Sequence, residues 1–271
     1  MTIWLGDACD GALVPATDAV VPLYSDGVAY GLGCFETMRV QDGRVFLLDW
    51  HLARMRVGCD RSGIEAPAPS MVRRAVDALT AVVLPQGVGR MRLVVAAGTG
   101  AGVHVWATLQ PLDTAEDGVH LVTSPWRRNP HSPLAGVKPL AYSETLLAQR
   151  DARRRGASDA LLLNTDGFLA ECATANVVVV REGRPHTPRI EDGALPGIGR
   201  RFLLADADGG VEETAIPSAW LDAVSEVFVV SALRGIRPVI SLDGRALVVG
   251  PVTTATQRRW EERAAAEDCW T

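Results

Sequence analysis

Hydrophobic and polar positions repeat along the chain with both helical and strand periods. Residues 70–84 begin with a serine and carry apolar residues at helical spacing, which predicts a helix. Residues 90–112 form two runs rich in β-branched residues joined by a glycine turn, which is typical of a β-hairpin. The stretches "NVVVV" at 176–180 and "EVFVVSAL" at 226–233 are almost entirely apolar, so we expect both to be buried strands.

Further helices are indicated both before and after a polar region that begins beyond Asp113. Helices are also predicted at residues 51–61, 143–156 and 253–267. The chain therefore has a mixed α and β pattern in two parts. Polarity rises beyond Asp113 and turn-forming residues follow, which places an interdomain linker at 118–126. We expect a smaller N-terminal α/β domain at 1–117 and a larger C-terminal α/β domain at 127–271.

Composition narrows the function classes. The 271 residues are 48% hydrophobic with a net charge of −5, so no basic footprint for nucleic acid is present. The N-terminal stretch lacks the pattern of a secretory signal, and no apolar run has membrane-spanning length. The five cysteines and five histidines are scattered without metal-ligand spacing. We expect a cytoplasmic enzyme with no metal, no membrane contact and no nucleic-acid partner.

One residue is chemically singular. Of the 27 basic residues, Lys138 is the only lysine, and the other 26 are arginine. Arginine supplies charge and anion binding equally well, but only a lysine amine can lose its proton and attack a carbonyl carbon. Two interpretations stay open at this point: a catalytic amine, or a surface lysine left by a coding bias toward arginine.

The stretch "GALPGIGRRFLL" suits an anion. Proline and Gly197 followed by an apolar-periodic run predict a loop that enters a helix. The backbone N–H groups of Ile198 and Gly199 would then point outward at the positive end of that helix, where a phosphate can bind. An ordinary glycine-proline loop is the alternative. Arg54, on a separate predicted helix, is the candidate cation for the same phosphate.

An acidic residue interrupts an apolar region. Glu171 lies in "GFLAECATANVVVV", and buried glutamates are rare unless they are paired. Its partner could be a protonated heterocyclic nitrogen or, alternatively, an arginine of the chain. A phosphate anchor, an amine that attacks carbonyls and a carboxylate for a pyridinium together point to pyridoxal 5′-phosphate, which serves enzymes as an electron sink.

With these residues in order, the sequence resembles the class IV aminotransferase family, the fold-type IV pyridoxal phosphate enzymes. "YGLGCFETMRVQDGRVFLLDWHLARM" is similar to the family's N-terminal block, whose arginine binds the cofactor phosphate; that position is Arg54. The central block resembles the segment in which a lysine binds the cofactor covalently (Lys138) and a glutamate contacts the pyridine nitrogen (Glu171). The phosphate loop falls at Ile198 and Gly199, where transaminases of the family usually have threonine in place of Gly199. The resemblance implies a two-domain fold-type IV architecture and a homodimer.

Two stretches distinguish members of the family. "RRNPHSPLAGVK" and "SALRGIRPV" resemble segments of 4-amino-4-deoxychorismate lyase, which forms 4-aminobenzoate and pyruvate in folate biosynthesis. Tyr142, four residues after the lysine, resembles the transaminases instead, and Ser231 replaces an asparagine of the lyase segment. The resemblance favours the lyase, with a D-amino-acid or branched-chain transaminase as the alternative. A third alternative is a protein that binds the cofactor without efficient turnover.

The lyase hypothesis adds three further candidate site residues. Tyr142 is expected to contact the cofactor. Tyr30 and Arg92 are candidates for substrate binding, and Arg92 could bind a substrate carboxylate as a fork. Each has a structural alternative: Tyr30 could pack at an interface, and Arg92 could form an ion pair within the protein.

Overall fold

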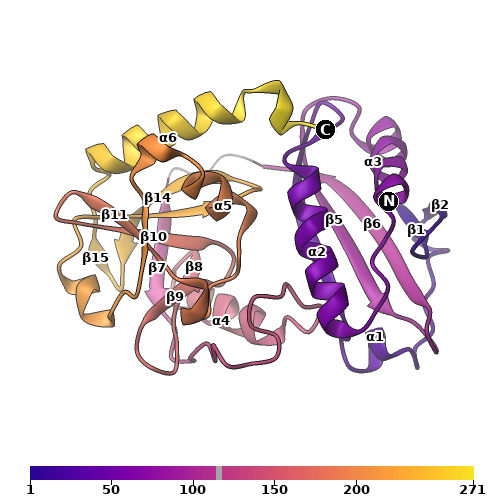
Figure 1. Ribbon diagram of the computed structural model, residues 1–271, viewed down its shortest axis with the longest axis horizontal. Helices are drawn as coiled ribbons and strands as arrows, with labels where there is room; N and C mark the ends of the chain where they lie inside the picture. Colours follow the sequence, from indigo (N-terminus) through magenta and orange to yellow (C-terminus); the bar gives the residue numbers. More distant parts are fainter. Residues whose placement is uncertain (114–117) are drawn as a thin grey trace. The chain divides into compact units, whose positions relative to one another are not determined.

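The computed structural model describes residues 1–113 and 118–271, which form two compact units (Figure 1). Unit 1 consists of Met1–Asp113, Val137–Tyr142 and Glu267–Thr271. Unit 2 consists of the described residues within Thr114–Gly136 and Ser143–Ala266. Two short segments from the later part of the sequence therefore complete the first unit, and Lys138 lies in one of them.

Unit 1 is built on one antiparallel sheet. Its strands run in the order β2-β1-β6-β5-β3-β4. They span β1 Thr2–Gly6, β2 Gly11–Pro15, β3 Gly33–Gln41, β4 Arg44–Val45, β5 Val88–Ala97 and β6 Val103–Pro111. The glycine-rich stretch between β5 and β6 is the turn of a hairpin, as the sequence predicts.

The core of unit 1 lies between this sheet and two helices, α2 (Leu48–Ser62) and α3 (Pro69–Val83). Alternate residues of the central strands point into this core, among them Met38 and Leu93. Proline at the first position of α3 suits a helix start, because its missing N–H would have no partner there. A shorter helix, α1, spans Asp26–Ala29.

The start of α2 depends on an unusual backbone conformation. Leu47 precedes the helix with φ of +52°, in the left-handed region that non-glycine residues rarely adopt. Its N–H donates to the carbonyl of Cys269 at 2.8 Å, and the N–H of Val45 donates to the carbonyl of Thr271 at 2.7 Å. The segment Glu267–Thr271, which includes the short helix η4 (Glu267–Cys269), therefore holds the turn that starts α2.

Unit 2 contains a nine-stranded mixed sheet. Eight strands follow the order β12-β11-β10-β13-β14-β7-β8-β9, and β15 pairs with β14. They span β7 Val119–Thr123, β8 Asp159–Leu163, β9 Leu169–Cys172, β10 Asn176–Arg181, β11 Arg184–Pro188, β12 Glu212–Thr214, β13 Glu226–Ser231, β14 Gly235–Leu242 and β15 Arg245–Ala246. The two apolar stretches of the sequence form β10 and β13, which pair near the centre of the sheet with buried side chains. The prediction of buried strands is confirmed at both.

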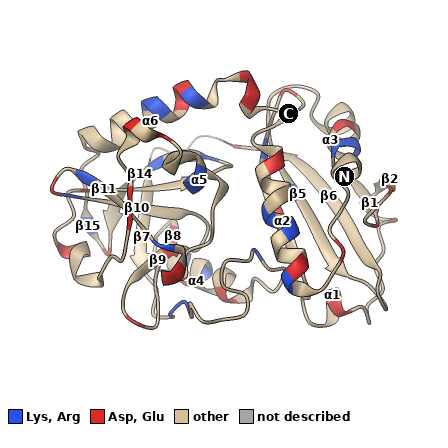
Figure 2. Cartoon of the chain, viewed as in Figure 1, with Lys and Arg blue, Asp and Glu red and all other residues tan. Residues whose placement is uncertain are grey.

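Helices connect and cover these strands. They are α4 Ser143–Arg154, α5 Ile198–Leu204, α6 Pro251–Ala264 and the short helices η1 Ile190–Asp192, η2 Ala207–Gly209 and η3 Ser218–Asp222. Strands β7 and β8 are parallel neighbours, so the connection between them needs a crossover, and it contains α4. Figure 2 shows acidic and basic residues mixed along α2 and α6, so neither helix presents a surface of one sign.

The domain boundaries of the structure differ from the sequence prediction. The expected linker at 118–126 contains β7, which pairs with β14 and β8 inside the sheet of unit 2. A segment of five residues can form a strand when the strands on both sides of it come from distant parts of the chain. The local pattern of polarity cannot reveal such pairing. Lys138 joins unit 1, although the prediction assigned it to the C-terminal domain. The part of the expected N-terminal domain at 114–117 lies outside the described residues.

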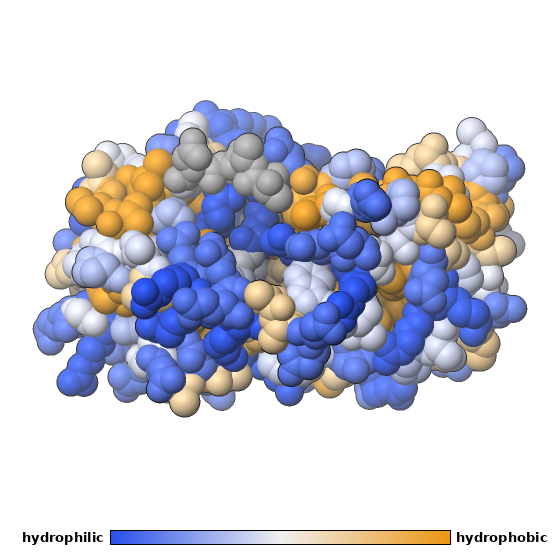
Figure 3. Space-filling model, turned by 90° about the horizontal axis from the view of Figure 1, so that it is seen from above, coloured by the Kyte–Doolittle hydropathy of each residue, from blue (hydrophilic) through white to orange (hydrophobic). Residues whose placement is uncertain are grey.

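The helix predictions hold at all four places, with shifted ends. The helix expected at 51–61 begins earlier, at Leu48, because Leu48 is buried in the core directly after the turn at Leu47. Among the described residues no helix is both long enough and apolar enough to cross a membrane. Figure 3 shows hydrophobic residues in separate patches among hydrophilic ones on the face that it presents.

Candidate active site

Lys138 is held by backbone pairing with the first residues of β3. The N–H of Phe35 donates to the carbonyl of Lys138 at 3.1 Å, and the N–H of Leu140 donates to the carbonyl of Gly33 at 2.8 Å. Cys34 and Pro139 form an isolated antiparallel bridge between these contacts. The lysine segment thus extends the sheet of unit 1, which fixes the backbone from which the amine projects.

The amine of Lys138 lies beside two aromatic rings. Its Nζ is 4.5 Å from the ring centroid of Phe35 and 5.1 Å from that of Tyr142. The two rings meet edge to face with centroids 5.0 Å apart. Phe35 is buried, and both rings face the cation within the range of a cation–π contact. The structure therefore brings Lys138 and Tyr142 together and adds Phe35, which the sequence analysis did not single out.

A second group surrounds Arg54 on α2. The Nε and Nη2 atoms of Arg54 donate to Glu36 at 2.8 and 2.5 Å, as a fork on the two oxygens of that carboxylate. His51, one helical turn before Arg54, contacts Glu36 through its Nδ1 at 2.6 Å. Glu36 and His51 are each only 1% exposed, whereas the side chain of Arg54 is 11% exposed. Neither Glu36 nor His51 was predicted as a site residue.

Electrostatics fix the charges of this group. Burial alone would raise the pKa of Glu36, but the charge of Arg54 and the contacts with His51 lower it from 4.5 to about 2. Burial lowers the pKa of His51 below 6.5, and the nearby charges of Arg54 and Lys138 act in the same direction against the attraction of Glu36. At neutral pH the group is therefore a carboxylate, a guanidinium and a neutral imidazole.

The two candidate substrate residues differ in their surroundings. The guanidinium carbon of Arg92 lies 3.9 Å from the ring centroid of Phe35, on the ring that also contacts Lys138. Arg92 has no ion-pair partner among the residues that the structure describes, which leaves its predicted alternative, a structural ion pair, without support. Tyr30 ends α1 and is 79% exposed, so within unit 1 it packs little against its surroundings.

In unit 2, Glu171 lies on β9 and is 8% exposed. Its Oε1 accepts from Nη2 of Arg128 at 2.8 Å, and its Oε2 accepts from the backbone N–H of Leu195 at 2.9 Å. The burial predicted from the sequence is confirmed, and an arginine partner, one of the two alternatives, is present. A carboxylate accepts up to about four hydrogen bonds, so this pairing is compatible with a further donor.

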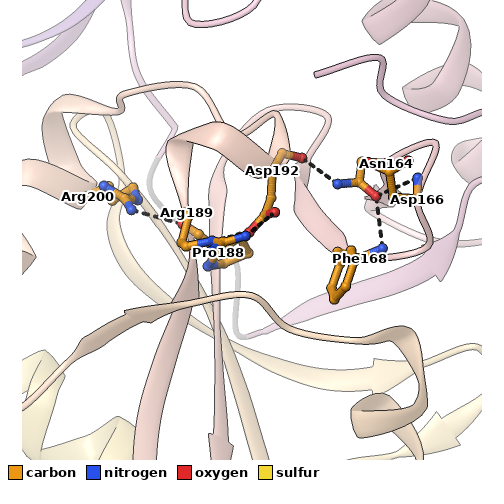
Figure 4. A network of polar contacts seen from close by, with 7 residues as sticks. All are labelled: Asn164, Asp166, Phe168, Pro188, Arg189, Asp192 and Arg200. Carbon is orange, nitrogen blue, oxygen red and sulfur yellow. Dashed lines mark hydrogen bonds and ion pairs between the residues drawn. The ribbon is translucent and has the colours of Figure 1, made fainter. Parts of the chain in front are cut away.

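A polar network fixes the loops on either side of Glu171 (Figure 4). The Oδ1 of Asn164 accepts from the N–H groups of Asp166 and Phe168, which closes the turn between β8 and β9. Its Nδ2 donates to the carbonyl of Asp192 at 3.2 Å. Asp192 also pairs with Arg189, so the turn before β9 and the segment that leads toward α5 are joined.

The predicted loop and helix are found at Gly197 and α5. Gly197 is the N-cap of α5, and Ile198 and Gly199 are its first two residues. A β-carbon at Gly199 would lie 2.7 Å from the carbonyl carbon of Ser231, and one at Gly197 would lie 1.8 Å from Oδ1 of Asn176. Only glycine lets the start of α5 approach the end of β13 this closely. The threonine usual in family transaminases is therefore excluded by packing in this chain.

The predicted site residues fall into two groups. Unit 1 holds Tyr30, Arg54, Arg92, Lys138 and Tyr142, and unit 2 holds Glu171, Ile198 and Gly199. These groups suit the predicted cofactor. Its aldehyde reacts with an amine, its phosphate is bound by cations or backbone amides, and its protonated ring nitrogen pairs with a carboxylate. His51 adds a buried Nε2 atom with no hydrogen-bond partner among the described residues, as expected of a site that a polar ligand completes.

Three further residues escaped the sequence analysis, although weak signals existed. Glu36 is an acidic residue within the otherwise apolar "GCFETM", the same signal that identified Glu171. His51 precedes Arg54 by three residues, which places both on one helix face. Arg128 belongs to the stretch "RRNP" before the lysine, but nothing in the sequence identifies Glu171 as its partner.

Comparisons with known proteins show which proteins the chain resembles over most of its length. A putative branched-chain-amino-acid aminotransferase of Methanocaldococcus jannaschii is 29% identical over 93% of this chain and 94% of its own length. An aminodeoxychorismate lyase of Bacillus subtilis is 30% identical over 75% of this chain and 74% of its own. The crystal structure of a branched-chain aminotransferase from Thermoproteus uzoniensis with norvaline matches with a TM-score of 0.89 at 27% identity, covering 100% of this chain and 98% of that one.

The family model for amino-transferase class IV matches residues 33–242, which include Lys138, Arg54 and Glu171. The PLP-bound form of a hypothetical aminotransferase from Mycobacterium tuberculosis shares the fold, with a TM-score of 0.87 at 24% identity over 98% of this chain and 99% of that one. The chain therefore belongs to the class IV aminotransferase family, which confirms the predicted family, the fold-type IV fold and the family's cofactor, pyridoxal 5′-phosphate.

Proposed function

We propose that this enzyme is a pyridoxal-phosphate-dependent 4-amino-4-deoxychorismate lyase, which forms 4-aminobenzoate and pyruvate for folate biosynthesis. The observation that carries the proposal is the position of the two lyase-like stretches. "RRNPHSPLAGVK" contains both Arg128, the partner of Glu171, and Lys138. "SALRGIRPV" begins at Ser231, against which Gly199 packs. Both stretches that separate lyase from transaminase therefore contain or contact predicted site residues.

Each site residue has a chemical task under this proposal. Arg54 and the backbone N–H groups of Ile198 and Gly199 bind the cofactor phosphate. Glu171, oriented by Arg128 and the N–H of Leu195, holds a proton on the pyridine nitrogen. When bound, the cofactor supplies the electron sink for charge that develops on the substrate. Tyr142 contacts the cofactor beside the amine.

Lys138 carries the proton transfer. Its Nζ would hold the cofactor covalently, and with the substrate bound the neutral Nζ would take the proton from the substrate carbon that bears nitrogen. The same Nζ returns a proton later in the reaction. Arg92 binds a substrate carboxylate as a fork, and Tyr30 contacts the substrate. The aromatic rings of Phe35 and Tyr142 lie beside Nζ.

A transaminase is the second candidate. Tyr142 beside Lys138 favours it, as do the aminotransferase relatives, which include a D-alanine aminotransferase of Bacillus licheniformis that is 26% identical over 95% of this chain. The two activities use the same lysine and differ in how the substrate is held and where the proton returns. We also propose a cytoplasmic homodimer, which size-exclusion chromatography with light scattering would test.

The decisive experiment supplies both kinds of substrate. Purified protein loaded with pyridoxal 5′-phosphate receives enzymatically generated aminodeoxychorismate, and 4-aminobenzoate and pyruvate are followed. Parallel samples receive D-alanine, L-leucine or L-glutamate, each with a keto-acid acceptor, and Lys138→Ala is run beside all of them. Equal amounts of 4-aminobenzoate and pyruvate, lost in Lys138→Ala, support the lyase. Amino-group transfer without 4-aminobenzoate would replace it with the transaminase, and full turnover by Lys138→Ala would refute both.

A further inference from the structure

Glu36 is the most enclosed charged group of unit 1, and none of the tasks above uses it. Both of its oxygens are engaged by Arg54, and His51 holds one of them in addition. Three donors from one helix thus converge on a carboxylate that projects from β3. The arrangement fixes the Nε edge of the Arg54 guanidinium.

The fold does not need an ion pair at this position, although Glu36, once enclosed, is stabilised in its ionised form by Arg54 and His51. Enclosing two charges costs desolvation, and replacing such a pair by apolar residues of similar volume is often neutral or even stabilising. Attraction for a phosphate does not account for it either. A carboxylate in contact with Arg54 reduces the positive potential that a phosphate would meet, so its charge works against anion binding. What Glu36 provides is a fixed direction for a side chain that otherwise has many rotamers.

His51 is suited to hold Glu36 in turn. Burial keeps it neutral, so it has one N–H, and the contact of 2.6 Å between Nδ1 and Glu36 assigns that proton to Nδ1. A neutral donor fixes the carboxylate without adding a competing charge. His51 therefore fixes the orientation of the Glu36 carboxylate, and Glu36 fixes the orientation of the Arg54 guanidinium.

We propose that Glu36, held by His51, is a positioning residue that orients Arg54 for the phosphate of the cofactor. The proposal rests on the proposed role of Arg54 but not on the choice between lyase and transaminase. Electrostatics alone predicts that a neutral residue at position 36 would strengthen phosphate binding, and the proposal predicts the opposite. Removing the negative charge should weaken phosphate binding, because the loss of orientation outweighs the gain in potential.

The test compares two ligands that differ only in the phosphate. Apoprotein is titrated with pyridoxal 5′-phosphate and with pyridoxal, and binding is followed by the visible absorbance of the protein-bound chromophore. In Glu36→Gln the side-chain shape is kept, but an amide N–H₂ faces the donors of Arg54 and the fork is lost. We expect the preference for the phosphorylated ligand to fall about ten- to a hundredfold, the range found when supporting partners of metal ligands are removed. Pyridoxal affinity should not change.

Matched controls make each result decisive. Asp49→Asn makes the same acid-to-amide change at an exposed position of α2 and should leave the preference intact. In the Arg54→Ala background, Glu36→Gln should have no further effect on the preference. Glu36→Asp, which keeps the charge with a shorter reach, should lie between the wild type and Glu36→Gln, and it serves as the test if Glu36→Gln does not fold.

The contrary outcomes are separable. Tighter binding of the phosphorylated ligand by Glu36→Gln would mean that only charge matters, and equal weakening of both ligands would mean a purely structural role. Either result overturns the positioning role. An unchanged preference in Arg54→Ala would refute the phosphate-binding role of Arg54 itself and the positioning role with it. A reduced preference in Arg54→Ala, but not in the Glu36 variants, would refute the positioning role alone.

Discussion

Each unit of the molecule contains a buried pair of arginine and glutamate, and the two pairs are built differently. In unit 1, Arg54 donates hydrogen bonds to both oxygens of Glu36, and the neutral His51 contacts one of them as well. In unit 2, Arg128 contacts one oxygen of Glu171, and a backbone N–H takes the other. The first carboxylate is almost fully enclosed, whereas the second pair keeps more contact with solvent, with the Arg128 side chain 22% exposed.

The arginine and the glutamate therefore have opposite proposed roles in the two pairs. In the Arg54–Glu36 pair the arginine is the proposed ligand contact, and the carboxylate supports it. In the Arg128–Glu171 pair the carboxylate is the proposed ligand contact, and the arginine supports it. The glutamate is the more buried partner in both pairs, so burial alone does not decide which of the two residue types faces a ligand.

Among variants of the two pairs, Glu171→Gln should give the largest effect on turnover. Its loss removes the carboxylate proposed for the ring nitrogen and leaves Arg128 without its counter-charge. We expect kcat/KM to fall about a hundred- to a thousandfold, the usual scale for one electrostatic contact at a reacting centre. Because the ring nitrogen is common to both ligands, pyridoxal 5′-phosphate and pyridoxal should be affected equally in absorbance titrations. A selective loss of the phosphorylated ligand would mean that the two pairs do not divide the work as proposed.

Acid should weaken the contribution of the Arg54–Glu36 pair to the stability of the fold. The pKa of Glu36 in the folded protein is about 2, below its ordinary 4.5, so its ionised form stabilises the fold. This contribution is fully present above pH 4.5 and is lost as pH falls from there toward 2. It amounts to about 3 kcal/mol, because one pKa unit corresponds to about 1.4 kcal/mol.

Urea unfolding of wild type and Glu36→Gln between pH 7 and pH 3 measures this contribution. The free energy of unfolding of the wild type should fall more steeply below pH 4.5 than that of the variant. The lowered pKa of His51 adds a loss in the same direction that begins near pH 6.5, so the comparison is made below pH 4.5. Parallel curves for the two proteins in that range would contradict the assignment of an ionised, stabilising Glu36.

The smallest effect is expected at an exposed pair that joins α2 to α3. Arg73 contacts Asp49 at 2.8 Å, but the two side chains are 41% and 69% exposed. Solvent screens such pairs, so Arg73→Ala should change the free energy of unfolding by no more than about 1 kcal/mol and leave turnover unchanged. Thermal unfolding and the lyase assay check this. If Arg73→Ala lowered the free energy of unfolding as much as Glu36→Gln does, burial would not distinguish the Arg73–Asp49 pair from the Arg54–Glu36 pair.

The residues that sequence reasoning found share one property. Lys138 is chemically singular, Gly197 precedes an apolar helical run, and Glu171 is acidic within an apolar run. Each of these signals is local, so it can be recognised without knowing what lies opposite in space. The helix start at Ile198 and the burial of Glu171 were predictable for the same reason.

Glu36 carries the same local signal as Glu171, but the pairings that the sequence analysis missed are all of long range. Glu36 and Arg54 come together because β3 packs against α2, and Arg128 meets Glu171 across 43 positions of the chain. The strand β7 was read as a linker because its partners β14 and β8 come much later in the sequence. The left-handed turn at Leu47 carries no signal in its residue type, since leucine seldom adopts it.

The docking of Glu267–Thr271 beside β4 has a consequence for how the chain folds. Arg44 donates to the carbonyl of Trp270 across 226 positions of sequence, which is a contact of very long range. Such contacts form late, because the entropy of closing a long loop must first be overcome. During synthesis the turn that begins α2 stays incomplete until residue 271 has emerged from the ribosome. Arg54 should therefore reach its final orientation among the last events of folding, after nearly all of unit 2 has been made.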